Sequence, residues 1–325
     1  MTPAAPRRST ARLWAALLLG LASLGAHAAP LVIAIGETSL FAPLQLAAQE
    51  GYFAAEGLDV KVIPCVNGRR CLKHLTDGDA QVATVADTPI VFALHAGHRF
   101  DIVASFGTTV HDTALVARAD RGIRTPADLA GKRLGVVRGT SAHYFANVFL
   151  LINGVPRDAV NIVFIDPNAG IDPLLRGDID AAALYRPYGP QAVQQLGAKG
   201  LVLKTLLPYA LMVNLVAQPG LSQDSLLRVL RAARRGVDLL NSQPARAQAL
   251  LAARWRTDTK TAAERLDGYE FRLVLSQNLL STLEAESRWA VREDLVERGG
   301  KPDFLEIMRV EPLRALDPRA VTLIK

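Results

Sequence analysis

The stretch Gly139-Thr140-Ser141, followed by His143, could support three kinds of chemistry: phosphate binding, nucleophilic catalysis, or anion binding at a helix start. A phosphate loop needs a lysine near its end, whereas residues 135–141 read GVVRGTS. A serine nucleophile needs a base and a third orienting group, and His143 would point to a different helix face from Ser141. We therefore expect Gly139, Thr140 and Ser141 to hold an anion with the unpaired N–H groups of a helix N-terminus. Simple capping by Thr140 or Ser141 is compatible with that role.

Cys65 and Cys71 are the only cysteines, and the spacing CVNGRRC places an Asn67-Gly68 turn between them. In an oxidising compartment this pattern predicts one short disulfide loop. Together with His74 the two sulfurs could instead form part of a metal site. A structural zinc takes four ligands, and no fourth is visible nearby, so we expect a disulfide and no metal.

Residues 1–28 have the three parts of a secretory signal. Arg7, Arg8 and Arg12 precede an apolar run from Leu13 to Leu24, and Ala26-His27-Ala28 resembles a cleavage site. A membrane span needs about 20 apolar residues, which is longer than this run. We expect the mature chain to begin near Ala29 and to reside in the periplasm with no membrane anchor.

The charge of the chain is mild. Removing the three signal arginines from the 37 basic residues leaves 34 against 31 acidic ones, a net charge of +3. This balance gives no reason to expect nucleic acid as a partner. The adjacent pair Arg69 and Arg70 is expected on a solvated face.

Apolar runs alternate with helical patterns along the first hundred residues. Strands are expected at 31–35, 59–63, 80–86 and 100–106, with helices between them. Asp87 or Thr88 would cap the helix at 87–97, with Pro89 as its first residue. Strands that alternate with helices predict a parallel α/β sheet.

The second third of the chain repeats the first. Residues 31–53 correspond to 133–155, and residues 76–97 correspond to 175–197, each as an apolar strand, a turn and a helix. Ser39 and Ser141 fall at matching turns. The repeat predicts two tandem α/β lobes whose strand-to-helix turns face one crevice, where ligands of such sheets bind.

Two extended apolar segments, 113–120 and 211–220, flank the second lobe and predict a two-crossing hinge. A helical pattern from Ser222 onward is expected to support the first lobe. The predicted organisation is a signal at 1–28, a first lobe formed by 29–112 and 217–325, and a second lobe with hinge segments at 113–216.

Four stretches carry a family resemblance: APLQLAAQEGYFAAEGLDVKV, DTPIVFA, IRTPADLAGKRLGVVRGTSAHYF and LLRGDIDAAALYRPY. They resemble the solute-binding proteins of ABC transporters for nitrate, aliphatic sulfonates, taurine and thiamine precursors. The resemblance implies a type II periplasmic binding protein fold that closes on a small-molecule ligand and delivers it to an ABC permease with its ATPase. It implies a monomer without a cofactor.

By resemblance, the ligand should also contact the first turn, the ADTP segment and the LYRP segment, through Ser39, Leu40, Phe41, Thr88, Tyr185 and Arg186. Many relatives carry Trp and an acidic residue where this chain has Tyr185 and Arg186. The arginine favours a sulfonate, a carboxylate or another anion over a cationic pyrimidine. Alternatively, Arg186 pairs with a nearby carboxylate and does not reach the ligand.

Two further functions remain open on this scaffold. A desulfinase-like or lyase-like enzyme is one, although a desulfinase would need a free nucleophilic cysteine in the crevice. A periplasmic sensor that passes its signal to a receptor is the other, because it would use the same binding physics.

Overall fold

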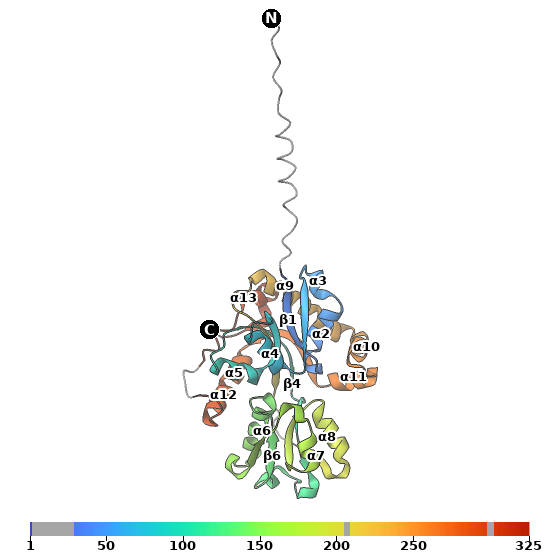
Figure 1. The fold of residues 1–325 in the computed structure, drawn as a ribbon, viewed down its shortest axis with the longest axis vertical. Helices are drawn as coiled ribbons and strands as arrows, with labels where there is room; N and C mark the ends of the chain where they lie inside the picture. The colour runs from blue at the N-terminus through green and yellow to red at the C-terminus, as the bar shows by residue number, and fades with distance from the viewer. Residues whose placement is uncertain (2–28, 205–208, 298–301, 325) are drawn as a thin grey trace. The chain divides into compact units, whose positions relative to one another are not determined.

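The computed structural model describes Met1 and residues 29–204, 209–297 and 302–324. The chain divides into two units, Met1–Pro30 and Leu31–Lys325, and all helices and strands in the described ranges lie in the second. Except for Met1, the expected signal segment at 1–28 lies outside the described residues. The second unit contains two separate sheets, each covered by helices (Figure 1).

The larger sheet has seven strands in the order β12-β11-β4-β10-β3-β1-β2. With its helices it is called the first lobe here. Its strands are β1 (Leu31–Gly36), β2 (Val60–Cys65), β3 (Val82–Ala86), β4 (Asp101–Thr109), β10 (Leu211–Ala217), β11 (Tyr269–Ser276) and β12 (Val321–Thr322). Its helices are α2 (Ala42–Gln49), α3 (Tyr52–Ala55), α4 (Gly68–Thr76), α5 (Asp87–His95), α9 (Gln223–Ser242), α10 (Pro244–Trp255), α11 (Thr259–Leu266), α12 (Gln277–Arg292) and α13 (Glu311–Leu316), with the short turn η1 (Ser39–Phe41) before α2.

The smaller sheet has five strands in the order β7-β6-β8-β5-β9 and forms the second lobe. Its strands are β5 (Thr113–Arg118), β6 (Arg133–Val136), β7 (Asn161–Phe164), β8 (Ala181–Tyr185) and β9 (Gly200–Leu203). The helices α6 (Ser141–Ile152), α7 (Asp172–Arg176) and α8 (Tyr188–Leu196) complete it.

The internal repeat is visible in the topology. β1 lies between β2 and β3 and is parallel to both, and β6 lies between β7 and β8 in the same way. Helices α2 and α6 follow the two central strands, so Ser39 and Ser141 both stand just beyond a central strand. The prediction of two tandem α/β lobes is therefore confirmed.

The prediction of a parallel sheet holds for β2-β1-β3 and β7-β6-β8 but not for the pairings of β10 and β5. β10 runs antiparallel to β3 and β4, and β5 runs antiparallel to β8 and β9. The chain crosses from one lobe to the other just before each of these two strands. A strand that enters its sheet from the crevice side must run opposite to the strands that end there, which explains both reversals.

One hinge segment also needs correction. Residues 211–220 were expected to cross between the lobes, but Leu211–Ala217 is strand β10, buried at every position in the larger sheet. Its apolar side chains pack on both faces of the sheet, and this full burial explains the continuous apolar run. Residues 113–118, the other expected segment, form β5 of the smaller sheet.

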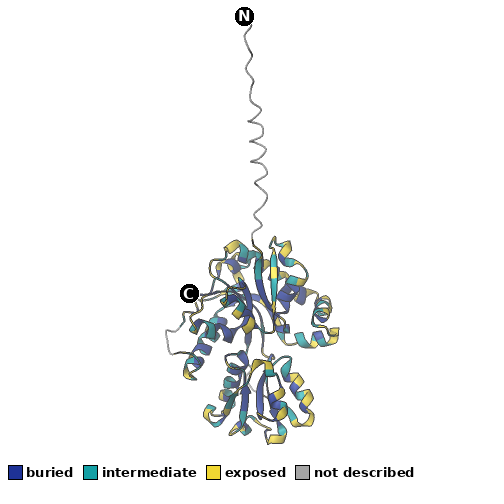
Figure 2. Cartoon of the chain, viewed as in Figure 1, coloured by how far each residue is buried: buried dark blue, intermediate teal, exposed yellow. Residues whose placement is uncertain are grey.

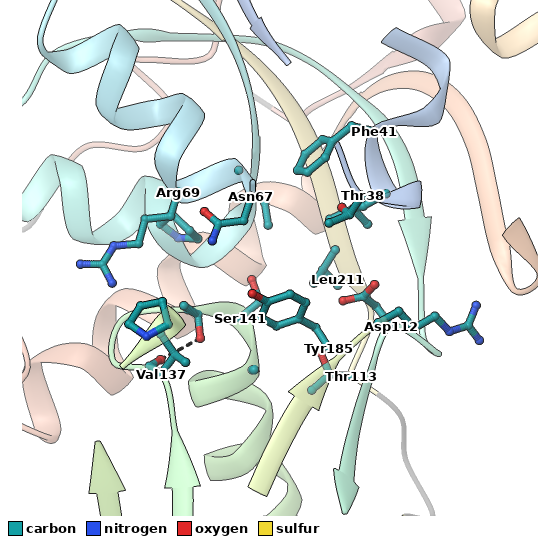
Figure 3. A pocket seen from close by; sticks show the side chains of 18 residues that line it. Thr38, Phe41, Asn67, Arg69, Asp112, Thr113, Val137, Ser141, Tyr185 and Leu211 are labelled. Atoms are coloured by element: carbon teal, nitrogen blue, oxygen red, sulfur yellow. Dashed lines mark hydrogen bonds between the residues drawn. The ribbon is translucent and has the colours of Figure 1, made fainter. Parts of the chain in front are cut away.

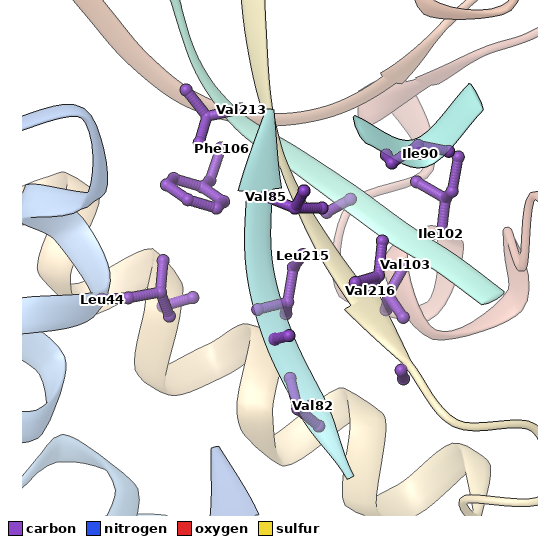
Figure 4. Close-up of a cluster of buried hydrophobic side chains, with 14 of the residues drawn as sticks. Leu44, Val82, Val85, Ile90, Ile102, Val103, Phe106, Val213, Leu215 and Val216 are labelled. Carbon is purple, nitrogen blue, oxygen red and sulfur yellow. The ribbon is translucent and has the colours of Figure 1, made fainter. Parts of the chain in front are cut away.

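Buried residues occupy the centre of each lobe (Figure 2), and their apolar side chains form a hydrophobic core there. In the first lobe, Leu44 of α2 and Ile90 of α5 pack against strands β3, β4 and β10 (Figure 4). The long helix α9 adds the stripe that its sequence predicts, and its buried members include Leu226, Leu230, Ala233, Val237 and Leu240. Helix α5 begins at Asp87 after the extended Ala86, so Pro89 is its third residue and not its first.

Gly236 is where α9 packs most closely on α2, because a Cβ at this position would meet the carbonyl oxygen of Pro43. We predict that Gly236→Ala lowers the free energy of unfolding by roughly 1–3 kcal/mol, although alanine favours helix by about 1 kcal/mol. Denaturant unfolding measures the change. The control is Asp238→Ala at an exposed position of the same helix, which should change stability by less than about 0.5 kcal/mol. A Gly236→Ala variant as stable as the wild type would contradict this packing.

Candidate ligand-binding site

A cavity lies between the two lobes, lined by residues of both (Figure 3). The first lobe contributes Thr38, Leu40 and Phe41 near η1, Asn67, Gly68 and Arg69 at the start of α4, and Ala86, Pro89 and Leu211. The second contributes Val137, Thr140, Ser141, Ala142, Pro167, Tyr185 and Arg186, and Asp112 and Thr113 stand at the crossing. The cavity has a volume of ≈ 80 Å³, room for about three waters at ~30 Å³ each, so this state fits a small solute.

Most of the predicted binding residues meet at this cavity. Leu40 and Phe41 line it from the first lobe, and Thr140, Ser141, Tyr185 and Arg186 line it from the second. Residues separated by more than a hundred positions thus share one site.

Three predicted residues lie beside the cavity and not on its wall. The Thr88 hydroxyl donates to Glu286 Oε1 at 2.6 Å, and the residue is fully buried behind the start of α5. Ser39 is buried within η1. Gly139 turns the chain with a φ of +70°, close against the ring of Phe92. None of the three is among the residues that line the cavity.

Helices α4 and α6 both begin at the cavity. The N–H groups of Gly68, Arg69, Ser141 and Ala142 have no acceptor within their helices, because they belong to the first turn. All four residues line the cavity. The two helix ends come from opposite lobes and each carries a partial positive charge, so together they favour an anion between them.

The Ser141 side chain has a different partner from its backbone. Its hydroxyl donates to Asp87 Oδ1 at 3.0 Å, a hydrogen bond from the second lobe to the first. Asp87 Oδ2 accepts from the N–H of Met212 at 3.0 Å. Burial raises the pKa of Asp87, and these hydrogen bonds oppose the rise. The serine thus connects the lobes, while its N–H remains available to a ligand.

His143 is not placed to act as a general base for Ser141. Its ring packs edge-on against Trp289 at 4.8 Å and against Phe164 at 5.4 Å, between the lobes. Burial lowers the pKa of His143 to about 4, helped by the charges of Arg157 and Arg138. The ring is therefore neutral at physiological pH and serves as a packed aromatic side chain.

Arg186 reaches across to the first lobe. Its Nη1 donates to the carbonyl of Asp267 at 2.7 Å, and its guanidinium lies 5.8 Å from the centre of the Tyr269 ring. The residue touches the cavity, but its charged end already has a carbonyl and a ring as partners. The partner of Arg186 is thus a backbone carbonyl and not the carboxylate that the alternative interpretation expected.

Sequence reasoning missed Asn67, Arg69, Asp112 and Thr113. Arg69 was expected on a solvated face, yet it lines the cavity and donates from Nη1 to the Arg138 carbonyl of the other lobe at 2.9 Å. The available signal was that CVNGRRC follows β2, so it is one more strand-to-helix turn at the same edge of the sheet. Asp112 stands at the crossing into β5, where no periodic pattern marks it.

A disulfide joins Cys65 at the end of β2 to Cys71 in α4, with their Cα atoms 5.5 Å apart, as predicted. The bridge closes the loop that carries Asn67, Gly68 and Arg69 to the cavity. His74, the third member of the alternative metal site, has its Nδ1 3.1 Å from Asp79 Oδ2. Within the described residues, no cluster of three or more His, Cys, Asp or Glu side chains could hold a metal.

Two α/β lobes around a shared cavity define a type II periplasmic binding protein fold. An alkanesulfonate-binding protein, SsuA from Xanthomonas axonopodis pv. citri bound to MOPS, has this fold, with a TM-score of 0.73 at 18% identity over 87% of this chain and 99% of that one. The NMT1/THI5-like family model matches residues 38–247, so the chain belongs to that family.

Two further comparisons bear on the site. The taurine-binding periplasmic protein of Escherichia coli is 28% identical over 188 residues, which cover 58% of this chain and 57% of that relative. The match therefore spans little more than half the length of the curated relative. The desulfurization enzyme DszB, solved as a mutant in complex with biphenyl-2-sulfinic acid, shares the fold with a TM-score of 0.63 at 17% identity, covering 89% of this chain and 99% of that one. Among the described residues, no helix is long and apolar enough to cross a membrane.

The disulfide loop yields a stability prediction. Replacing both cysteines, Cys65→Ala with Cys71→Ala, should lower the free energy of unfolding by about 2 kcal/mol, since the closed loop is short. Thermal melting of the oxidised wild type, the reduced wild type and the double variant measures this, and the last two should agree. Two reactive thiols in the unreduced, denatured wild type would contradict the bridge.

Proposed function

We propose that this chain is the periplasmic solute-binding component of an ABC importer and captures a small organic anion, sulfonate-like or carboxylate, between its lobes. The observation that carries the proposal is the pair of helix N-termini, α4 and α6, that face one cavity from opposite lobes. Their unpaired N–H groups can replace the water that an oxyanion loses on binding. Arg69 lines the same wall, and its guanidinium, which donates to the Arg138 carbonyl, lies at the edge where the lobes meet.

The comparisons support this class of ligand. The named relatives include a taurine-binding periplasmic protein and an alkanesulfonate-binding protein, and both names denote binding of a sulfonate. Export to the periplasm rests on the signal pattern at 1–28 and agrees with the compartment in the relative's name. The partner that would accept the solute is a membrane permease with its ATPase.

An enzyme on this scaffold has less support. The desulfurization enzyme DszB shares the fold. A desulfinase on this scaffold would need a nucleophilic cysteine at the ligand. Cys65 and Cys71 are the only cysteines of this chain, they are joined to each other, and neither lines the cavity. The cavity also lacks a serine with a free base, because Ser141 bonds to Asp87 and His143 is packed against Trp289.

The proposal assigns different roles to two neighbouring arginines. Arg69 lines the cavity, whereas Arg70 is exposed on α4 and does not. Arg69→Gln should weaken the binding of ethanesulfonate by roughly threefold to tenfold, about 1 kcal/mol for a charge-assisted contact at a partly exposed site. Arg70→Gln is the control with the same change of net charge, and its affinity should stay at the wild-type value.

Calorimetric titration of the three proteins measures the affinities, and melting curves without ligand check the folds. Equal affinities for all three proteins would show that Arg69 does not contact the ligand. Failure of the wild type to bind any alkanesulfonate or short carboxylate would contradict the proposed function.

A further inference from the structure

The end of α12 reaches from the first lobe onto helix α6 of the second, and both helices lie on the left in Figure 1. Three residues of the segment 289–295 make the contact: Trp289 by its ring, Glu293 by its carboxylate and Leu295 by its carbonyl. We call this segment the α12 strap. None of its three contacting residues lines the binding cavity, so the strap joins the lobes outside it.

Trp289 forms the apolar part of the strap. Its ring centre lies 4.8 Å from that of His143 and 5.2 Å from that of Tyr144, in edge-on contacts with the first turn of α6. Phe92 of α5 packs on the same ring from the first lobe, at 6.1 Å. Trp289 is only 2% exposed, so moving α6 away would bring buried aromatic surface into water.

Two polar contacts flank the aromatic one. The Arg157 Nε lies 3.4 Å from Glu293 Oε2, and the Arg138 Nη2 donates to the Leu295 carbonyl at 3.4 Å. Arg138 precedes α6 and Arg157 follows it, in η4 (Arg157–Ala159), so the strap contacts the second lobe at both ends of that helix. Exposed ion pairs of this kind contribute little, which leaves Trp289 as the main source of stabilisation.

The position of the strap links it to ligand affinity. The binding site needs the start of α4 from the first lobe and the start of α6 from the second, so it is complete only when the lobes are in contact. The apparent dissociation constant is the intrinsic one divided by the fraction of molecules in the competent state. His143, Tyr144 and Trp289 do not line the cavity, so their contact favours that state equally for every solute.

Resting on the proposed function, we propose that the α12 strap holds the lobes in the binding-competent placement and sets the affinity for all solutes by one common factor. Trp289 is then a positioning residue, which acts through the placement of α6 and does not touch the solute. A residue of the cavity wall differs from it, because its replacement changes the affinities of different solutes by different factors.

The experiment compares Trp289→Ala with Leu283→Ala. Leu283 is fully buried on the same helix, inside the core of the first lobe, so its replacement lowers stability without touching the second lobe. Calorimetry with ethanesulfonate and with propanoate measures affinity, and melting curves measure stability. We expect Trp289→Ala to weaken both probes by the same factor, at least about threefold. Leu283→Ala should melt at a lower temperature and keep the wild-type affinities.

Small-angle scattering without a probe gives a second readout that does not depend on binding. Trp289→Ala should have a larger radius of gyration than the wild type, since the lobes lose their main contact outside the cavity. Leu283→Ala should give the wild-type curve.

The outcomes separate this proposal from the function on which it rests. Wild-type affinities in Trp289→Ala overturn the strap, and so does a loss confined to one probe, because it places the ring against the solute. An equal loss in Leu283→Ala also overturns it, because lower stability would then explain the effect. If the wild type binds neither probe, the proposed function is contradicted, and scattering alone decides: an unchanged curve for Trp289→Ala overturns the strap.

If Trp289→Ala does not fold, Tyr144→Ala carries the same test from the second lobe. Tyr144 is half-buried and packs on both Trp289 and Tyr209 of the first lobe. Its replacement should again weaken both probes by one factor and enlarge the molecule, and wild-type behaviour in both measurements contradicts the proposal.

Discussion

Unpaired backbone N–H groups at the starts of α4 and α6 are the constraint on which the rest of the structure depends. A helix cannot satisfy its own first turn, and here two such ends from different lobes face the same small space. The parallel cores β2-β1-β3 and β7-β6-β8 bring these ends to the crevice edges of their sheets. The disulfide between Cys65 and Cys71 fixes the loop before α4, and the hydrogen bond from Thr140 Oγ1 to the Val137 carbonyl, 2.8 Å long, fixes the turn before α6.

Contacts between the lobes are polar on one side of α6 and aromatic on the other. Ser141 donates to the buried Asp87, whose remaining oxygen accepts from the backbone of β10, and His143 and Tyr144 pack on Trp289 of the first lobe. Both sets leave the first N–H groups of α6 facing the cavity. Leaving Asp87 unpaired at full burial would cost several kcal/mol, so the hydrogen bonds of the polar set are strongly favoured. These contacts fix one placement of the second lobe against the first. A ligand that bridges both helix ends would favour the same placement.

The sequence predicted the repeated unit because its signals are local: an apolar strand, a turn and an amphipathic helix recur at nearly constant offset. Leu40, Phe41, Thr140, Ser141, Tyr185 and Arg186 were found because they belong to those turns or to the family resemblance. Strand direction was not predictable from the same signals, since the antiparallel placement of β10 and β5 depends on where the chain crosses between lobes. Asp112 and Thr113 were missed for a related reason. They stand at a crossing, and only the tertiary structure shows that Tyr269, Arg186 and the cavity wall surround them.

The central claim is that helix ends from both lobes bind one anion, and backbone amide NMR tests it most directly. Titration of the wild-type protein with an alkanesulfonate should shift the amide resonances of Gly68 and Arg69 in α4 together with those of Ser141 and Ala142 in α6. Both groups should follow a single dissociation constant, because one ligand contacts both helix ends. Shifts confined to one helix, or two groups with different dissociation constants, would contradict a shared site between the lobes.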